Sequence, residues 1–344
     1  MSLNPGHRFA TNLRFALFLT ILVGPNALLG GQTATSGPIE DASLIPLEQS
    51  ARRGDTVAQN NLAFRYYSGR SVPQNYIEAA KWFSASASSG LPAAHYNLGA
   101  LYEHGYGVPN DYGKALSHYR AAAEQGHLLA QARLGLMYEC GVGVAPDLQE
   151  ALKWYRAAAE QGDASATSKL GDLYYAGAGV ARDYSEAASW YRKAADQGLA
   201  VAQNNLAALY HHGRGEPQDY SAAVELYRKA AIQGLAEAQN NLGVMYQDGL
   251  GVEKDYRQAA YWYRAAAEQG NYEGQYDLAT LYATGRGVSL DYVSAYIWYN
   301  LAAASGDERS ARQLKTLSRL MTPRQRSIAK IRIAEGAELI SKTP

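Results

Sequence analysis

One glycine recurs every 36 residues along most of this 344-residue chain, and that spacing limits the possible folds more than any other feature of the sequence. The recurring residues are Gly54, Gly90, Gly126, Gly162, Gly198, Gly234, Gly270 and Gly306. A fixed period of roughly 20–50 residues is typical of repeat architectures, in which each unit packs on its neighbours. Taking this glycine as repeat position 1 defines seven full repeats over residues 54–305, without insertion or deletion.

Each repeat has the pattern of two helices joined by a glycine loop. Ala, Leu and Tyr at positions 5, 9 and 13 share one face of a first helix, and Ala, an aromatic residue and Ala at positions 26, 30 and 34 share one face of a second. Gly or Ala at position 10 lets a neighbouring helix approach closely. Glycines at positions 16 and 18 supply the positive φ angles that end the first helix. Asp or Asn at position 22 is a good N-cap for the second helix. The sequence therefore predicts an all-α solenoid.

Tyrosine is the unusual residue in the composition, because the chain has 27 Tyr and only 5 Phe. Positions 13, 23 and 30 hold most of the tyrosines, and position 29 holds all five tryptophans: Trp82, Trp154, Trp190, Trp262 and Trp298. A single two-helix repeat is too small to bury both helices. We therefore expect these aromatic side chains to pack against alanines of the next repeat, with their polar tips at the boundary between repeats.

Both ends of the repeat array have the pattern of caps. Residues 35–53 are expected to form a linker and an N-terminal half-repeat, in which Ala51 occupies position 34. Residues 306–344 are expected to form a C-terminal half-repeat and a capping helix that starts at Pro323. An open-ended array needs such terminal elements, with polar outer faces, to stay in solution.

Residues 1–34 have the features of a secretory signal peptide. Basic residues precede an apolar run from Phe15 to Val23, and small and polar residues follow it. A membrane-spanning helix needs about 20 apolar residues, so this run is too short to be one. We expect the segment to be cleaved and the chain to be periplasmic or secreted, and not an integral membrane protein once processed. Retention of the segment as an anchor is the alternative.

Charge and composition exclude several functional classes. Because 32 Lys+Arg balance 32 Asp+Glu, the chain lacks the cationic surplus that coats nucleic acid or an anionic membrane. The single cysteine, Cys140, excludes an internal disulfide framework and a thiolate-rich metal site. Adjacent His211 and His212 point about 100° apart on a helix, which makes a poor metal site. We expect no catalytic residues, no cofactor and no metal.

The repeat resembles that of the Sel1-like family, relatives of the tetratricopeptide repeats with a slightly longer unit. The shared residues are A-x-x-x-L-[GA]-x-x-Y-x-x-G-x-G-V-x-x-D-Y-x-x-A-x-x-W-Y-x-x-A-A-x-x-G, as in Ala238 to Gly270. The resemblance covers all seven repeats and implies a right-handed α-solenoid. Members are mostly scaffolds and adaptors, among them bacterial envelope proteins that restrain sensor kinases, organise exopolysaccharide secretion or assist host invasion. A cysteine-rich branch is reported to bind or hydrolyse β-lactams, but its paired cysteines are absent here.

Position 8 is the candidate partner-binding row, because in related tetratricopeptide repeats this residue of the first helix faces the ligand in the concave groove. The row comprises Asn61, Asn97, Arg133, Lys169, Asn205, Asn241 and Asp277. Asn can pair with a peptide backbone as donor and acceptor, and Arg and Lys can hold a carboxylate. The hypothesis is a groove for an extended segment whose acidic group docks at Arg133 and Lys169. The alternative is that position 8 is merely exposed to solvent.

These observations favour a monomeric, non-catalytic protein-interaction scaffold or regulator of the bacterial cell envelope. Its partner would be a protein, for example an envelope sensor kinase or a secretion component. One alternative is a component of exopolysaccharide or cell-wall assembly that binds glycan or the export machinery, with exposed Tyr96 and Tyr276 stacking on sugar. A β-lactam-binding hydrolase is a remote alternative, because the sequence offers no set of nucleophile, base and orienting group.

Overall fold

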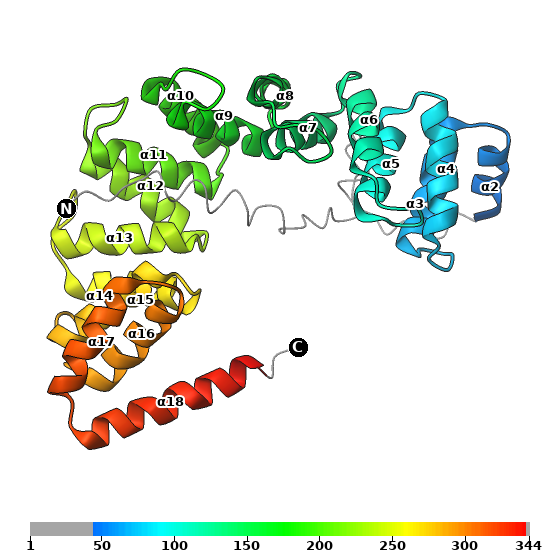
Figure 1. Ribbon diagram of the computed structural model, residues 1–344. Helices are drawn as coiled ribbons and strands as arrows, with labels where there is room; N and C mark the ends of the chain where they lie inside the picture. Colours follow the sequence, from blue (N-terminus) through cyan, green and yellow to red (C-terminus); the bar gives the residue numbers. More distant parts are fainter. Residues whose placement is uncertain (1–43, 342–344) are drawn as a thin grey trace. The chain divides into compact units, whose positions relative to one another are not determined.

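The computed structural model describes residues 44–341, with side chains described as far as residue 335, and every regular element in that range is an α-helix (Figure 1). The first helices of the seven repeats are α3 (Thr56–Ser68), α5 (Pro92–His104), α7 (Leu128–Cys140), α9 (Ala164–Ala176), α11 (Ala200–His212), α13 (Ala236–Asp248) and α15 (Tyr272–Thr284). The second helices are α4 (Tyr76–Ser88), α6 (Tyr112–Ala123), α8 (Leu148–Glu160), α10 (Tyr184–Asp196), α12 (Tyr220–Ile232), α14 (Tyr256–Glu268) and α16 (Tyr292–Ala304). Helix α2 (Leu44–Arg52) precedes them, and α17 (Glu308–Leu320) and α18 (Pro323–Ser341) follow.

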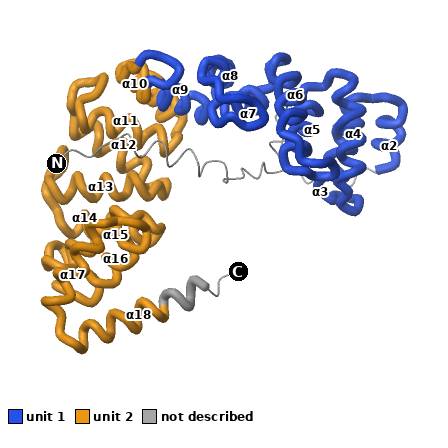
Figure 2. The backbone as a smooth tube through the Cα atoms, in the orientation of Figure 1, with its two compact units in different colours: residues 1–173, 177–181 blue, residues 174–176, 182–344 orange. Residues whose placement is uncertain are grey.

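The described helices form two compact units, and the boundary between the units falls at the end of α9 (Figure 2). Unit 1 covers residues 44–173 and 177–181, and unit 2 covers residues 174–176 and 182–341. Within each unit, successive helices pack on one another in chain order, from α2 to α8 in unit 1 and from α10 to α17 in unit 2. The predicted all-helical solenoid of stacked repeats is confirmed.

The aromatic residue at position 30 is the centre of the core in every repeat. These residues are Phe83, Tyr119, Tyr155, Tyr191, Tyr227, Tyr263 and Tyr299, and none is more than 3% exposed. Tyr227 of α12, for example, lies in a cluster with Ala207 of α11 and Ala238 of α13. Position 10 must be small where this ring crosses it, because a Cβ on Gly135 would lie 2.5 Å from the ring of Tyr155. The predicted packing of aromatics against alanines is confirmed.

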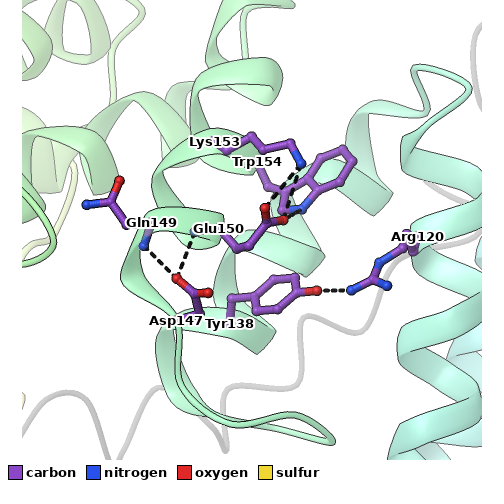
Figure 3. A network of polar contacts seen from close by, with 7 residues as sticks. All are labelled: Arg120, Tyr138, Asp147, Gln149, Glu150, Lys153 and Trp154. Carbon is purple, nitrogen blue, oxygen red and sulfur yellow. Dashed lines mark hydrogen bonds and ion pairs between the residues drawn. The ribbon is translucent and has the colours of Figure 1, made fainter.

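At position 13, the hydroxyl groups of Tyr138, Tyr210, Tyr246 and Tyr282 each accept a hydrogen bond from an arginine of the preceding repeat. Arg192 donates a hydrogen bond to the hydroxyl of Tyr210 at 3.0 Å, although 18 residues separate the two. Arg120 and Tyr138 make the same contact between α6 and α7 (Figure 3). These four hydroxyl groups therefore lie at the boundaries between repeats, as expected.

The predicted N-caps are confirmed for the second helix of all seven repeats. The side chain of each cap residue accepts at least one hydrogen bond from a backbone N–H group in the first turn of its helix. The cap residues are Asn75, Asp111, Asp147, Asp183, Asp219, Asp255 and Asp291. Figure 3 shows Asp147 capping α8 beside Glu150, which accepts a 3.0 Å hydrogen bond from Nε1 of Trp154. The second loop glycine also brings repeats together, since a Cβ on Gly107 would overlap the backbone of Tyr76.

The terminal helices cover the exposed ends of the stack. Ala51 of α2 is 1% exposed and packs with Ala58 and Leu62 of α3. At the other end, Met321 and Ala329 are buried in the cluster that contains Tyr299. No helix among residues 44–341 is both long enough and apolar enough to cross a membrane. The signal peptide expected over residues 1–34 lies outside the described residues.

Candidate partner-binding face

The position-8 side chains and their neighbours on the first helices form the candidate site within each unit, and we call this surface of either unit the first-helix face. Asn97 on α5 donates from Nδ2 to Oδ1 of Asn60 on α3 at 3.1 Å, and Asn241 on α13 makes the same bond with Asn204 on α11 at 3.0 Å. Asn97 is only 2% exposed, and Asn61 is half-buried. The interpretation that position 8 is merely exposed to solvent is therefore wrong, because the side chain there links one first helix to the next.

The two cations of the row are already paired with carboxylates of their own chain. Arg133 forms an ion pair with Glu103, with Nε 3.1 Å from the nearer carboxylate oxygen. Lys169 lies 3.4 Å from Glu139. The two glutamate side chains are only 8% and 6% exposed. The predicted docking of a partner's acidic group at Arg133 and Lys169 would therefore require that group to displace these glutamates.

A buried tyrosine completes each of these two pairs. The hydroxyl of Tyr119 donates to Glu103 at 2.7 Å, and that of Tyr155 donates to Glu139 at 2.5 Å. Burial raises the pKa of both phenols well above the ordinary value, and the charge of Glu139 raises that of Tyr155 further. Both phenols are therefore neutral donors at physiological pH. Each glutamate is held between a phenol and a cation, which fixes the shape of this part of the face.

The glutamates occupy position 14 and were missed by sequence reasoning that considered position 8 alone. Each lies 30 residues before its cation. Only the two repeats with Glu at position 14 are followed by a basic residue at position 8. This covariation within one chain was the available signal, because neighbouring first helices place positions 14 and 8 side by side.

In unit 2 the row continues with Asn205, Asn241 and Asp277. Asp277 is half-buried on α15. Burial raises its pKa to about 7, since the attraction of Arg309 is too weak to compensate and the charges of Asp248 and Asp307 add to the effect. The same row is thus neutral with internal ion pairs in unit 1 and has an excess of acidic groups in unit 2.

The tyrosines expected to stack on sugar do not present open ring faces. Tyr96 is 7% exposed and packs against Tyr119 and His127, with ring centroids 5.5 and 4.9 Å away. Tyr276 is half-buried, and the guanidinium of Arg309 lies 4.4 Å from its ring centroid. The expectation that both are exposed is wrong, and the glycan-binding alternative loses the residues on which it depended.

Cys140, His211 and His212 are the other residues that the sequence singles out for possible chemistry. Burial raises the pKa of the Cys140 thiol, and the charge of Glu139 raises it further, so the thiol is protonated at neutral pH. The rings of His211 and His212 stack on each other, 4.6 Å apart. Within residues 44–335, no three His, Cys, Asp or Glu side chains gather into a group that can hold a metal ion.

A family model for the Sel1 repeat matches the chain seven times. The matched residues are 56–91, 92–127, 128–163, 164–199, 200–235, 236–271 and 273–307. The chain belongs to the Sel1-repeat family. Proteins of this family are in general scaffolds for protein interactions, and typically they are not catalytic.

Two solved structures of bacterial proteins are similar to this Sel1-repeat chain. One is a protective antigen present in uropathogenic Escherichia coli strains, with 39% identity and a TM-score of 0.76 over 82% of this chain and 61% of that one. The present chain therefore spans less than two thirds of that antigen. The other is a Sel1 repeat protein from Oxalobacter formigenes, with 34% identity and a TM-score of 0.64 over 71% of this chain and 96% of that one. No curated protein matches the chain at a significant level.

Proposed function

We propose that this Sel1-repeat chain is a non-catalytic scaffold or regulator of the bacterial cell envelope, which binds a segment of a protein partner along the first-helix face. The observation that carries the proposal is the linkage of this face from helix to helix, by amide pairs and by buried ion pairs. A surface held in this way is preorganised, so little conformational entropy is lost when a partner binds. The proposed lining residues are Asn61, Asn97, Arg133, Lys169, Asn205 and Asn241.

The internal ion pairs change what this lining recognises. Glu103 and Glu139 neutralise Arg133 and Lys169, the two position-8 cations of unit 1. The first-helix face of unit 1 is therefore polar, and its position-8 row adds no net charge. Half-buried amides such as that of Asn61 can both donate to and accept from a peptide backbone. We therefore expect unit 1 to bind an extended backbone more than an acidic side chain.

Site-specific photo-crosslinking in the native envelope tests this function. A benzoylphenylalanine replaces Asn61 or Asn205 on the first helices and, as a control, the exposed Glu225 on α12. We expect both first-helix positions to form the same discrete protein adduct, which mass spectrometry identifies, and the control position to form none. Adducts at Glu225 alone, or none at any position, would contradict the proposal.

The proposed export is tested separately by the N-terminus of the native protein. Sequencing of the mature chain from a periplasmic extract should give a start near residue 35. An intact Met1 on chain recovered from the cytoplasm would exclude an envelope role and would leave the binding face itself untouched.

A further inference from the structure

The tyrosine, glutamate and cation of unit 1 have altered counterparts in unit 2. On α13, α14 and α15 the matching positions 14, 30 and 8 are Gln247, Tyr263 and Asp277. In this group the acidic residue stands at position 8, where the two groups of unit 1 have their cation, and position 14 holds an uncharged glutamine. The group therefore contains a carboxylate but no basic residue.

The charged groups around Asp277 leave it with surplus negative charge. Burial raises the pKa of Asp277, the charge of Arg309 lowers it, and the charges of Asp248 on α13 and Asp307, the N-cap of α17, raise it further. Arg309 donates from Nε to Oδ1 of Asp307 at 2.9 Å and lies over the ring of Tyr276. Among the described residues, no hydrogen bond or ion pair reaches the carboxylate of Asp277.

A second observation points to the same place. Tyr263 is 0% exposed, and within the described part of the chain its hydroxyl has no hydrogen-bond partner. Its counterparts Tyr119 and Tyr155 each donate to a glutamate. By the register of the repeats, Tyr263 occupies beside position 8 the place that Tyr119 and Tyr155 occupy in unit 1, where each phenol shares a glutamate with the position-8 cation. Burial raises the pKa of Tyr263, and the charge of Asp277 raises it further. A buried polar group without a partner is rare in folded proteins, so this hydroxyl marks the group in which the polar network of unit 1 is incomplete.

We propose that Asp277, backed by Tyr263 and flanked by Asp248 and Asp307, binds the guanidinium or ammonium group of a basic residue in the partner segment. This inference rests on the proposed function and names the chemistry of the partner. The bound cation would take the role that Arg133 and Lys169 have in unit 1, where a cation of the chain itself meets the carboxylate. Asp277 keeps part of its surface exposed, and a charge-assisted hydrogen bond to an ionised carboxylate is roughly twice as strong as a bond between neutral groups.

Binding of a cation here should release a proton near neutral pH. Burial and the neighbouring carboxylates raise the pKa of Asp277 to about 7, so the group is only partly ionised in the unbound chain. A bound cation favours the ionised form. Between pH 6 and pH 8 the ionised fraction rises about tenfold, and the affinity for a basic segment should rise by about the same factor.

A random dodecapeptide library, selected separately on the full wild-type chain and on the full Asp277→Asn and Glu225→Gln variants, tests the inference. We expect wild type and Glu225→Gln to enrich peptides with a shared Arg or Lys, and Asp277→Asn to lose that preference. Calorimetry with the best wild-type peptide should give at least a tenfold weaker Kd for Asp277→Asn and a change below twofold for Glu225→Gln. The affinity for this peptide should rise from pH 6 to pH 8 for wild type and Glu225→Gln, and it should not rise for Asp277→Asn.

The outcomes separate this inference from the proposed function. Enriched peptides without a shared basic residue, or a basic preference that survives in Asp277→Asn, would overturn the inference while the binding scaffold stands. Enrichment of no peptide on any of the three proteins would overturn both. The circular dichroism spectrum of Asp277→Asn should match that of wild type, and its thermal midpoint should be equal or higher, because the substitution removes an unpaired charge. Loss of the preference for basic peptides would then not reflect unfolding.

Discussion

The ammonium group of Lys169 lies 3.4 Å from the carboxylate of Glu139, which is 30 residues earlier in the sequence and on the preceding first helix. The glutamate side chain is 6% exposed and the lysine 31%. A residue that looks like a ligand-binding cation in the sequence is therefore part of the joint between two repeats. The pairing of Arg133 with Glu103 repeats the arrangement one repeat earlier.

Removing one partner of this pair should destabilise the protein more than removing both. Lys169→Met leaves the carboxylate of Glu139 buried without its cation, and we expect the free energy of unfolding to fall by about 1–3 kcal/mol. The double variant Glu139→Gln/Lys169→Met should recover part of that loss. Urea unfolding of the full double-mutant cycle measures both effects.

The exposed pair of Lys81 and Glu78 is the matched control, because Lys81 is 65% exposed. Lys81→Met should change the free energy of unfolding by less than about 0.5 kcal/mol. Equal losses for Lys169→Met and Lys81→Met would show that the buried pair contributes nothing beyond a surface contact.

Substitution of Gly135 should disturb the contact between α7 and α8. A Cβ at this position would lie 2.5 Å from the ring of the fully buried Tyr155, so the ring or the helix must shift. We expect Gly135→Ala to lower the free energy of unfolding by about 1–3 kcal/mol. Gly113 in α6 is exposed, and a Cβ there meets only a side-chain oxygen at 3.4 Å, so Gly113→Ala should stabilise by about 0.5–1 kcal/mol. Thermal unfolding of both variants tests this difference. Similar changes in the thermal midpoint for Gly135→Ala and Gly113→Ala would contradict the close packing of Gly135 against Tyr155.

A glutamine in place of Ser305 should complete an interrupted series of hydrogen bonds. Gln269 donates from Nε2 to Oε1 of Gln239 at 2.8 Å, and Ser305 is the corresponding residue one repeat later. Because the serine side chain is shorter than that of glutamine, Oε1 of Gln275, the counterpart of Gln239, is buried without a hydrogen-bond partner among the described residues. Ser305→Gln should raise the free energy of unfolding by about 0.5–1.5 kcal/mol. Ser305→Ala is the control, and a glutamine variant no more stable than the alanine variant would refute the prediction.

The contact of His95 with His118 should make the stability of unit 1 depend on pH. Their Nδ1 atoms lie 3.1 Å apart, so one ring donates and the other accepts. Burial lowers the pKa of both rings below 6.5, and each proton added to one ring repels the other. The neutral forms are favoured in the folded state. Their contribution is therefore present above pH 6.5 and is lost as the pH falls through the lowered values.

Replacement of His118 separates this effect from the other histidines. Position 29 is tryptophan in five repeats, so His118→Trp should fold, and its thermal midpoint should fall less than that of wild type between pH 7 and pH 5. Parallel pH profiles of the two proteins would mean that the histidine contact has no role in the pH dependence.

The sequence by itself determined the helices, the repeat and the caps. The glycine period, the Asp or Asn at position 22 and the spacing of Ala, Leu and Tyr are local signals, and each acts within one helix or one turn. Asp147 caps α8 through N–H groups only two and three residues away, which is why such a residue can be interpreted without a structure. The small residue at position 10 was also predictable, because the facing aromatic residue belongs to the same repeat.

Only the tertiary structure decided what the face presents to a partner. Whether Arg133 is open to a ligand depends on Glu103 of the preceding first helix. Whether Tyr96 is exposed depends on Tyr119 of α6 and on His127, the N-cap of α7. Charge and exposure at one position are thus set by side chains that packing brings close from about 20 to 40 residues away. For that reason the sequence pointed to two cations as the docking place, whereas in the packed helices of residues 44–335 it is the carboxylate of Asp277 that has no hydrogen-bond or ion-pair partner.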